Sequence, residues 1–203
     1  MSRMTLLLIR HGETEWNLEG RYQGHFDSPL TDRGVAQAEA FGRTLRNLPA
    51  FASAEVVASP LERARRTAEI ICRRRPISSF RTDDRLREIS LGSWDGLTRL
   101  ELKASHPGIF DGDGRYEWYF RSPNGESYEA VVARITEWLS ETNEGRAMVI
   151  VTHGIVGRVL RGIYAGLPRS VAISLPAPQD KMFLLSGGAI GEIPVSPPDA
   201  APE

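Results

Sequence analysis

The feature that most constrains the fold is an alternation of short apolar runs with longer amphipathic stretches along the 203-residue chain. Continuous apolar runs of four or five residues are typical of strands covered on both faces, and apolar residues three or four apart predict helices. Strands that alternate with helices favour an α/β fold with a mostly parallel sheet. The sequence predicts strands at 6–9, 55–58, 147–151 and 181–186, and helices at 31–48, 61–74, 126–141 and 154–165.

The same patterns predict a single domain over residues 1–190. Within it, residues 107–123 follow neither period and contain three glycines followed by four aromatic side chains. A long loop inside a compact domain is often a lid, so we expect a lid-like insertion at about 97–125. The compatible alternative is that the aromatic side chains simply pack on the body of the domain. Residues 191–203 are rich in proline and poor in large apolar residues, which predicts a flexible C-terminal tail.

Composition excludes several classes of protein. The 25 basic and 26 acidic residues nearly cancel to a net charge of −1, which argues against a general nucleic-acid binder. Cys72 is the single cysteine, so an internal disulfide and a Cys-rich zinc site are excluded. Every apolar run is far shorter than the ~18 residues of a membrane span, and the first is too short for a signal peptide. We therefore expect a cytoplasmic protein without a membrane partner.

Basic side chains follow three of the predicted strands. Arg10 and His11 come directly after the first strand, Arg63 follows the second, and His153 follows the third. In open α/β sheets, ligands bind at the edge formed by the carboxyl ends of the strands. If these strands are parallel and adjacent, the four side chains converge there.

The segment after the second strand reads Ser59-Pro60-Leu61-Glu62, which predicts a capping box with Ser59 as the N-cap and Glu62 at N3. Arg63 then lies in the first helical turn, where a cation opposes the helix dipole at a cost of about 0.3–1 kcal/mol. Arg63 and Arg66 are therefore expected to need an anion nearby. The alternative is a surface arginine that tolerates this small cost.

The sequence lacks the motifs that mark the common classes of nucleotide-binding proteins and hydrolases. The sequence contains no P-loop, no G-x-S-x-G elbow and no G-x-G-x-x-G after a strand. The nearest histidines, His11 and His25, are too far apart for a local metal-binding motif. We therefore expect a pocket of imidazole and guanidinium groups without metal or cofactor. His25 and His106 are expected to be structural.

Such a pocket suits phosphoryl chemistry. Two arginines can hold a phosphoryl group by bidentate hydrogen bonds, a neutral histidine can attack its phosphorus, and a second, protonated histidine can stabilise its oxygens. The leaving oxygen then needs a proton from a carboxylic acid. Five carboxyl groups remain open as candidates on composition alone: Glu13, Glu15, Glu88, Asp95 and Glu126.

The segment Leu-Ile-Arg-His-Gly-Glu-Thr-Glu-Trp-Asn at 8–17 resembles the signature of the histidine phosphatase superfamily, the phosphoglycerate-mutase-like enzymes. Five further blocks match in the same order, and the resemblance runs from about residue 4 to residue 186. These blocks lie at 23–31, 59–67, 86–96, 123–127 and 152–154.

The resemblance implies a three-layer α/β/α sandwich and a role for each matching residue. It implies that His11 is the nucleophile that becomes phosphorylated, and that Glu88 donates a proton to the leaving group and later activates water. It further implies no metal and no cofactor. The residues implied to hold the phosphoryl oxygens are Arg10, Arg63 and His153, and those implied to line the substrate side are Asn17, Gln23 and Gly24.

The departures from the family pattern favour its phosphatase branch. The cofactor-dependent mutases carry an Arg-His-Tyr-Gly stretch and a later arginine pair, whereas residues 88–96 here read Glu-Ile-Ser-Leu-Gly-Ser-Trp-Asp-Gly, followed only by isolated Arg115 and Arg121. A mutase must retain a doubly anionic intermediate, which these missing cations disfavour. The sequence is similar to the broad-specificity phosphatases, including α-ribazole and sugar-phosphate phosphatases.

We therefore expect a phosphomonoesterase that acts on a small phosphorylated metabolite through a phosphohistidine. The alternatives are a phosphoglycerate mutase and a non-catalytic sensor of a phosphate ligand.

Overall fold

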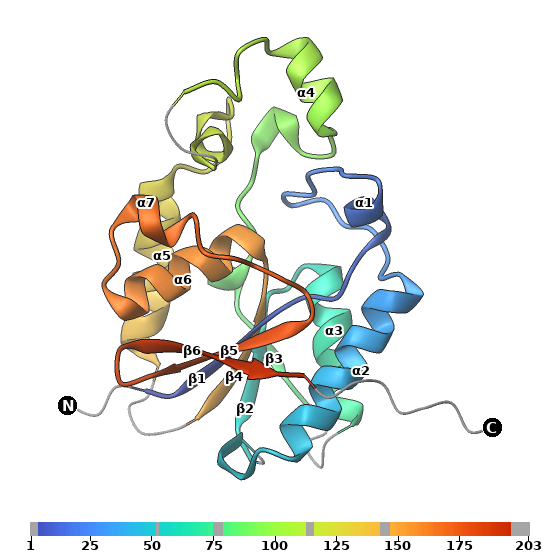
Figure 1. Ribbon diagram of the computed structural model, residues 1–203, viewed down its shortest axis with the longest axis vertical. Helices are drawn as coiled ribbons and strands as arrows, with labels where there is room; N and C mark the ends of the chain where they lie inside the picture. The colour runs from blue at the N-terminus through green and yellow to red at the C-terminus, as the bar shows by residue number, and fades with distance from the viewer. Residues whose placement is uncertain (1–3, 52, 75–78, 113–115, 143–146, 196–203) are drawn as a thin grey trace.

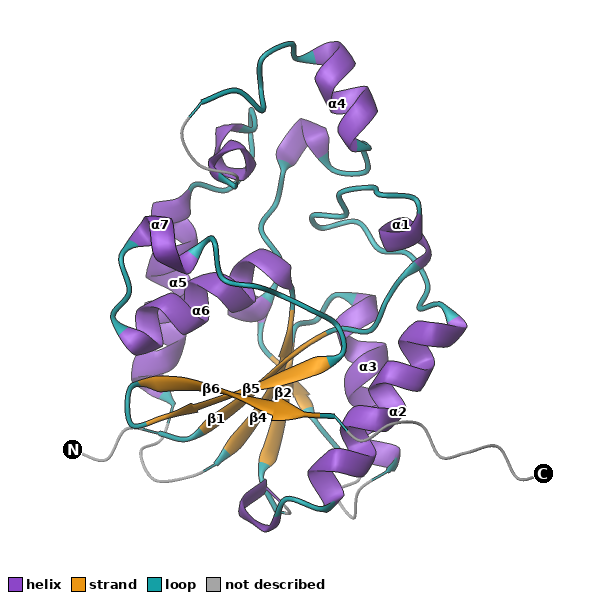
Figure 2. Cartoon of the chain, in the orientation of Figure 1, coloured by secondary structure: helices purple, strands orange, loops and turns teal. Residues whose placement is uncertain are grey.

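A six-stranded sheet forms the centre of the computed structural model, which describes residues 4–51, 53–74, 79–112, 116–142 and 147–195 (Figure 2). The strand order is β3-β2-β4-β1-β5-β6; the pairs among the first four strands are parallel, and the last two strands add antiparallel pairs. The strands are β1 (Leu6–Arg10), β2 (Glu55–Ala58), β3 (Arg81–Thr82), β4 (Met148–Thr152), β5 (Lys181–Ser186) and β6 (Ala189–Pro194).

Helices cover both faces of this sheet, with α2 and α3 on one side and α5 and α6 on the other (Figure 1). This is the predicted three-layer α/β/α arrangement with a mostly parallel sheet, and the prediction is confirmed. The helices are α1 (Glu15–Leu18), α2 (Asp32–Arg46), α3 (Glu62–Arg73), α4 (Arg99–Ser105), α5 (Tyr128–Glu141), α6 (Gly154–Ala165) and α7 (Arg169–Ala172).

The continuous apolar runs arise because both faces of the central strands are buried. In β1, Leu6 and Leu8 belong to the core beneath α5 and α6, whereas Leu7 and Ile9 belong to the core beneath α2 and α3. Successive side chains of a strand point to opposite faces, so a strand between two helical layers needs an apolar residue at every position. Each such side chain contributes about 1.5–3 kcal/mol on burial.

Backbone pairing continues beyond the ends of the strands and holds the following segments side by side. The N–H of His11 donates to the carbonyl of Thr152 at 2.9 Å, and the N–H of Ser59 donates to the carbonyl of Val151 at 2.9 Å. The segments after β1, β2 and β4 therefore start at adjacent points of one sheet edge.

The helix α4 and the 3-10 turn Glu117–Arg121 lie above this edge (Figure 1). Within this turn, Trp118 is buried in the core and stacks on Tyr119 with ring centroids 3.9 Å apart. Tyr119 and Phe120 also pack against this core, and the lid-like role of 97–125 stays a prediction. Residues 113–115, including Arg115, lie outside the described residues.

The prediction of a flexible tail from residue 191 is wrong for its first four residues. These continue β6, which pairs antiparallel with β5 along its whole length to Pro194. The strand is an exposed edge strand held by backbone hydrogen bonds, so it lacks the apolar pattern on which the prediction depended. Residues 196–203 lie outside the described part of the chain. In the described part, no helix has the length and apolar character needed to cross a bilayer.

Candidate active site

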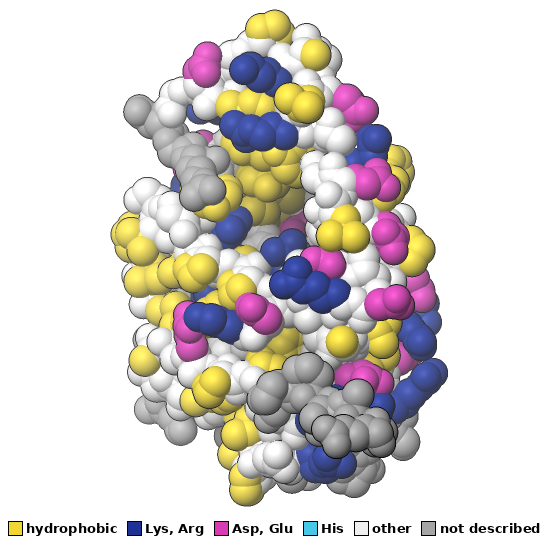
Figure 3. Space-filling view, turned by 45° about the vertical axis from the view of Figure 1, so that its right-hand side comes forward, with side chains coloured by type: hydrophobic (Ala, Val, Ile, Leu, Met, Phe, Trp, Pro, Cys, Tyr) yellow, Lys and Arg dark blue, Asp and Glu magenta, His cyan; other side chains and the backbone are white. Residues whose placement is uncertain are grey.

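The basic side chains that follow β1, β2 and β4 meet at the carboxyl edge of the sheet, as predicted. The rings of His11 and His153 lie 5.2 Å apart between centroids, and Arg10, His11, Arg63 and Glu88 line a common pocket of about 160 Å³. Figure 3 shows the molecule hollowed beneath its upper part, with an apolar upper wall. The volume is below the ~300–1,000 Å³ of pockets for drug-sized ligands, which suits a small ligand.

His11 is held in one tautomer. Its Nδ1 lies 2.8 Å from the carbonyl oxygen of Gly12, and because a carbonyl only accepts, Nδ1 carries the proton. Burial, together with the nearby Arg63 and Arg10, lowers the pKa of His11 well below its ordinary value of 6.5. The neutral ring therefore keeps a free electron pair on Nε2 at neutral pH, as a nucleophile requires.

His153 lies beside His11 but is not among the residues that line the pocket. Its Nε2 is 2.7 Å from the hydroxyl of Ser59, and its buried Nδ1 has no hydrogen-bond partner among the described residues. Burial and the charge of Arg63 lower the pKa of His153 well below 6.5. His153 is therefore neutral in the unliganded site, and a bound anion would favour its protonation.

Arg63 is almost completely buried and binds the loop of residues 24–27. Its Nη1 donates to the carbonyl of Phe26 at 2.6 Å and to the carboxylate of Asp27 at 2.7 Å, and its Nη2 donates to the carbonyl of Gly24 at 2.8 Å. The expectation that Arg63 needs an anion is confirmed, and a carboxylate of the same chain supplies it. Arg66 pairs with Glu69 at 3.0 Å.

The predicted capping box at Ser59 is wrong. Helix α3 begins at Glu62 with Leu61 as its N-cap, and no side chain of the cap residue contributes a hydrogen bond. Instead, the carboxylate of Asp27 accepts hydrogen bonds from the N–H groups of Glu62 at 2.9 Å and Arg63 at 3.3 Å. A carboxylate distant in sequence performs the capping role, while the hydroxyl of Ser59 faces His153.

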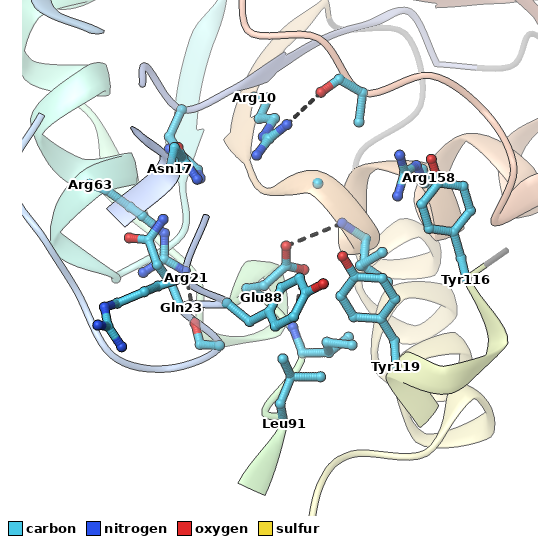
Figure 4. Close-up of a pocket in the computed structure, with 17 residues that line it drawn as sticks. Arg10, Asn17, Arg21, Gln23, Arg63, Glu88, Leu91, Tyr116, Tyr119 and Arg158 are labelled. Carbon is cyan, nitrogen blue, oxygen red and sulfur yellow. Dashed lines mark hydrogen bonds between the residues drawn. The ribbon is translucent and has the colours of Figure 1, made fainter. Parts of the chain in front are cut away.

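Glu88 is the one carboxylate among the described residues that line the pocket. One of its oxygens accepts hydrogen bonds from the N–H groups of Ile89 and Val156 at 3.1 Å each, and the other accepts from the N–H of Ile155 at 3.2 Å. Two of these donors are free N–H groups at the start of α6, where a carboxylate is favoured. Figure 4 shows Glu88 between Arg63 and Tyr119.

The four other candidate carboxylates lie elsewhere. Glu13 accepts a hydrogen bond from Thr31, Asp95 binds backbone N–H groups, Glu126 pairs with Arg134, and Glu15 is exposed at the start of α1. Their positions leave Glu88 as the acid that the pocket brings beside the basic groups.

The predicted substrate-side residues Asn17, Gln23 and Gly24 also line the pocket. The Nε2 of Gln23 donates to the hydroxyl of Thr14 at 2.8 Å, and Thr14 is the N-cap residue of α1. Gly24 has φ of +50° and lies so close to Asp95 that a Cβ there would overlap the carboxylate. Glycine is therefore required at position 24 by both its backbone conformation and its surroundings.

The upper wall includes Tyr116 and Tyr119, which belong to the aromatic segment that the sequence analysis singled out, and Arg158, which sequence reasoning missed (Figure 4). The Nε of Arg158 donates to the carbonyl of Leu175 at 2.6 Å, and its guanidinium lies 4.1 Å above the ring of Tyr116. Arg158 stands four residues after Gly154, on the same face of α6, and this spacing was a signal that could have found it. The other missed lining residues are Arg21, Tyr22, Ile89, Leu91, Ile155 and Ala177.

The charges of the pocket suit an anionic ligand. Arg10 donates from Nη1 to the carbonyl of Ala177 at 2.7 Å, and its buried Nε has no hydrogen-bond partner among the described residues. Neither Arg10 nor Arg158 forms an ion pair within the described part of the chain, whereas Arg63 is paired. In that part, no group of three or more His, Cys, Asp or Glu side chains is placed to hold a metal ion.

Comparisons with known proteins agree with this arrangement. The family model of the histidine phosphatase superfamily (branch 1) matches residues 6–181. A probable phosphoglycerate mutase, GpmB, of Salmonella paratyphi C is 34% identical over 92% of this chain and 91% of its own length.

Solved structures of similar proteins span almost the whole chain. YhfR of Bacillus stearothermophilus is 34% identical, with a TM-score of 0.77 over 93% of this chain and 94% of its own. A putative alpha-ribazole-5'-P phosphatase of Escherichia coli is 26% identical, with a TM-score of 0.77 over 97% of this chain and 100% of its own. The mycobacterial glucosyl-3-phosphoglycerate phosphatase, solved with VO3, is 29% identical, with a TM-score of 0.74 over 97% and 99%.

The strand-end histidines and arginines, the fold and these matches lead to one conclusion: the chain belongs to the histidine phosphatase superfamily (branch 1).

Proposed function

We propose that this protein is a metal-independent phosphomonoester hydrolase that acts on a small phosphorylated metabolite through a phosphohistidine at His11. The observation that carries the proposal is the tautomer of His11. Its Nδ1–H points at the Gly12 carbonyl and so leaves Nε2 with a free electron pair in a pocket shared with Arg10, Arg63 and Glu88.

In the first step, Nε2 of His11 attacks phosphorus and the bond from phosphorus to the leaving oxygen breaks. Glu88, in its carboxylic acid form, gives its proton to that oxygen, and the product alcohol leaves. Arg10 and Arg63 hold the phosphoryl oxygens, and His153 stabilises their charge when the bound anion has brought it a proton. The products of this step are phosphohistidine and the Glu88 carboxylate.

In the second step, the Glu88 carboxylate takes a proton from water as the water oxygen attacks phosphorus. The bond between phosphorus and Nε2 breaks, which releases inorganic phosphate and restores neutral His11. Glu88 returns to its acid form, so the two steps close a cycle without an additional reactant.

The experiment that tests Glu88 uses two substrates that differ in their need for protonation. An alkoxide is a poor leaving group, whereas a nitrophenolate leaves almost unaided. Glu88→Gln should slow the phosphorylation of His11 by an alkyl phosphate about 10²–10⁴-fold, and its effect with p-nitrophenyl phosphate should be much smaller. Rapid-quench measurement isolates this step from the later hydrolysis.

The matched control is Glu15→Gln, which changes an exposed carboxylate at the start of α1 outside the pocket lining. It should leave the phosphorylation rates of both substrates unchanged. Equal losses for both substrates in Glu88→Gln would show that Glu88 is not the acid.

A second candidate function, phosphoglycerate mutase, is favoured by the similarity of the chain to the probable phosphoglycerate mutases GpmB. The two functions differ in their products, because a hydrolase releases inorganic phosphate and a mutase interconverts 2- and 3-phosphoglycerate. A screen of phosphate release over phosphoglycerates, sugar phosphates, nucleotides and α-ribazole phosphate separates them. Binding without any turnover would instead support a sensor.

A further inference from the structure

His25 lies outside the pocket lining but contacts the residue that we propose as the acid. Its Nε2 lies 2.9 Å from the backbone carbonyl oxygen of Glu88. Because that oxygen only accepts, Nε2 carries a proton and donates it to the hydrogen bond. The general expectation of a structural role for His25 therefore takes a specific form: the ring holds the main chain of Glu88.

The backbone of His25 holds the same segment at a second point. Its N–H donates to one oxygen of Asp95 at 3.3 Å, and the other oxygen of Asp95 accepts a hydrogen bond from the N–H of Leu91 at 2.9 Å. Gly24, the preceding residue, packs against the same carboxylate. The ring and the backbone of His25 thus each form a hydrogen bond that links the loop of residues 24–27 to the segment 88–95.

The same loop binds Arg63 on its other side. The carbonyls of Gly24 and Phe26 and the carboxylate of Asp27 accept all the hydrogen bonds that the guanidinium of Arg63 makes within the described residues. One short loop therefore connects a cation that lines the pocket to the main chain of the proposed acid.

Glu88 lies outside every helix and strand, so contacts from other segments hold its main chain. Its carboxylate is held by N–H groups of Ile89, Ile155 and Val156, but these contacts do not fix its backbone carbonyl. Within the described residues, this carbonyl accepts its hydrogen bond from the ring of His25. A shift of the main chain here would carry the carboxyl group away from the leaving oxygen.

We propose that His25 is a positioning residue that sets Glu88 for proton transfer to the leaving group. This inference rests on the proposed function, in which Glu88 is the acid. A single hydrogen bond of this kind alters an equilibrium or rate about 3- to 10-fold. The loss should fall on substrates that need protonation and should spare those that do not.

The test is rapid-quench phosphorylation of His11 in His25→Ala with an alkyl phosphate and with p-nitrophenyl phosphate. The rate with the alkyl phosphate should fall about 3- to 10-fold, and the rate with p-nitrophenyl phosphate should stay near that of the unmodified protein. His25→Gln, which keeps an N–H donor, should recover most of the alkyl phosphate rate. Equal losses for both substrates, or no loss, would overturn the proposal.

Phe26→Ala is the matched control, because it removes a neighbouring exposed side chain of the same loop and keeps the carbonyl that binds Arg63. It should leave the ratio of the two rates unchanged. A ratio altered as strongly as in His25→Ala would trace the effect to the loop in general and overturn the specific role of His25.

Combining His25→Ala with Glu88→Gln separates this proposal from the proposed function. If His25 acts through Glu88, its replacement should cost nothing further for the alkyl phosphate in the Glu88→Gln background. If His25→Ala lowers the alkyl phosphate rate as much in this background as in the unmodified protein, His25 does not act through Glu88. If Glu88→Gln lowers the alkyl phosphate rate selectively but His25→Ala does not, only the positioning role of His25 is refuted. If Glu88→Gln shows no such selectivity, Glu88 is not the acid.

Discussion

The floor and the upper wall of the pocket are built in different ways. The floor consists of Arg10, His11 and Arg63, which lie at or after strand ends and are held by hydrogen bonds to neighbouring backbone. The upper wall consists of Tyr116 and Tyr119 near the 3-10 turn, with Arg158 from α6 opposite them (Figure 4).

In the proposed function, this difference separates the chemistry from the choice of substrate. Strand ends and the loop 24–27 hold the floor, which would bind the phosphoryl group. Tyr119 of the wall is held by stacking on Trp118, and the wall would face the rest of the substrate. Changes to the floor should therefore remove turnover, and changes to the wall should alter which substrate is used.

The largest effect is expected from His11→Ala, which removes the proposed nucleophile of the floor. Phosphate release should fall by at least about 10⁴-fold, while thermal unfolding should still show a cooperative transition. The control is His106→Ala, which changes a histidine beside Trp94 in the upper part of the molecule. It should retain turnover, and substantial turnover by pure His11→Ala would contradict the assignment.

The second-largest loss of activity is expected from Arg63→Lys, although this substitution keeps the positive charge. A lysine has one nitrogen and cannot reach the carbonyls of Gly24 and Phe26 and the carboxylate of Asp27 together. Loss of two charge-assisted hydrogen bonds at about 1.5–3 kcal/mol each predicts a fall in kcat/KM of about 10²–10⁴-fold. The steady-state kinetics of Arg65→Lys, a change in an exposed arginine of α3, provide the comparison. Near-normal kinetics in Arg63→Lys would place it outside the machinery.

The buried histidines of the floor should make stability depend on pH. Since burial lowers the pKa values of His11 and His153 well below 6.5, the unfolded chain takes up their protons first as the pH falls. The free energy of unfolding should therefore decrease below about pH 6.5, by up to about 1.4 kcal/mol per pH unit for each histidine. Urea unfolding between pH 7.5 and 5.5 measures the slope, and NMR of the imidazoles should show both neutral at about pH 6.5. A protonated His11 in the unliganded protein at that pH would contradict the tautomer argument.

A smaller and selective effect is expected from Arg158→Met in the wall. Arg158 has no carboxylate partner in the described part of the chain, so it is available to a second acidic group of a substrate. KM should rise about 10-fold for phosphoglycerates, as for one charge-assisted hydrogen bond, and change little for phenyl phosphate. Equal changes for both would mean that Arg158 does not contact the leaving group.

No effect at all is expected from chelators. The proposed steps use imidazole, guanidinium and carboxyl groups throughout, so dialysis against EDTA should leave the rate of phosphate release unchanged. Loss of activity that a divalent ion restores would refute the metal-independent mechanism.

The elements with strong periodicity were predictable from the sequence. The predicted helix at 154–165 coincides with α6, and the predicted strand at 147–151 differs from β4 by one residue at each end. The short elements β3, α1, α4 and α7 were not predicted, because two to seven residues carry too little periodic pattern. The edge strand β6 was missed because its backbone pairing leaves no apolar signal.

In the candidate site, too, some residues could be predicted from local sequence and others could not. Local sequence determined that Arg10, His11 and His153 lie at or directly after strand ends, because apolar runs that end in polar residues are visible along the chain. Contacts between distant segments decided the rest. They brought Asp27 rather than Ser59 to the start of α3, and selected Glu88 from five carboxylates by binding it to α6. They also placed Arg158 over the ring of Tyr116 and brought His25 within hydrogen-bond distance of the Glu88 carbonyl. Periodicity reports which face of an element is buried, but the partner on the other side of a contact depends on how the layers pack.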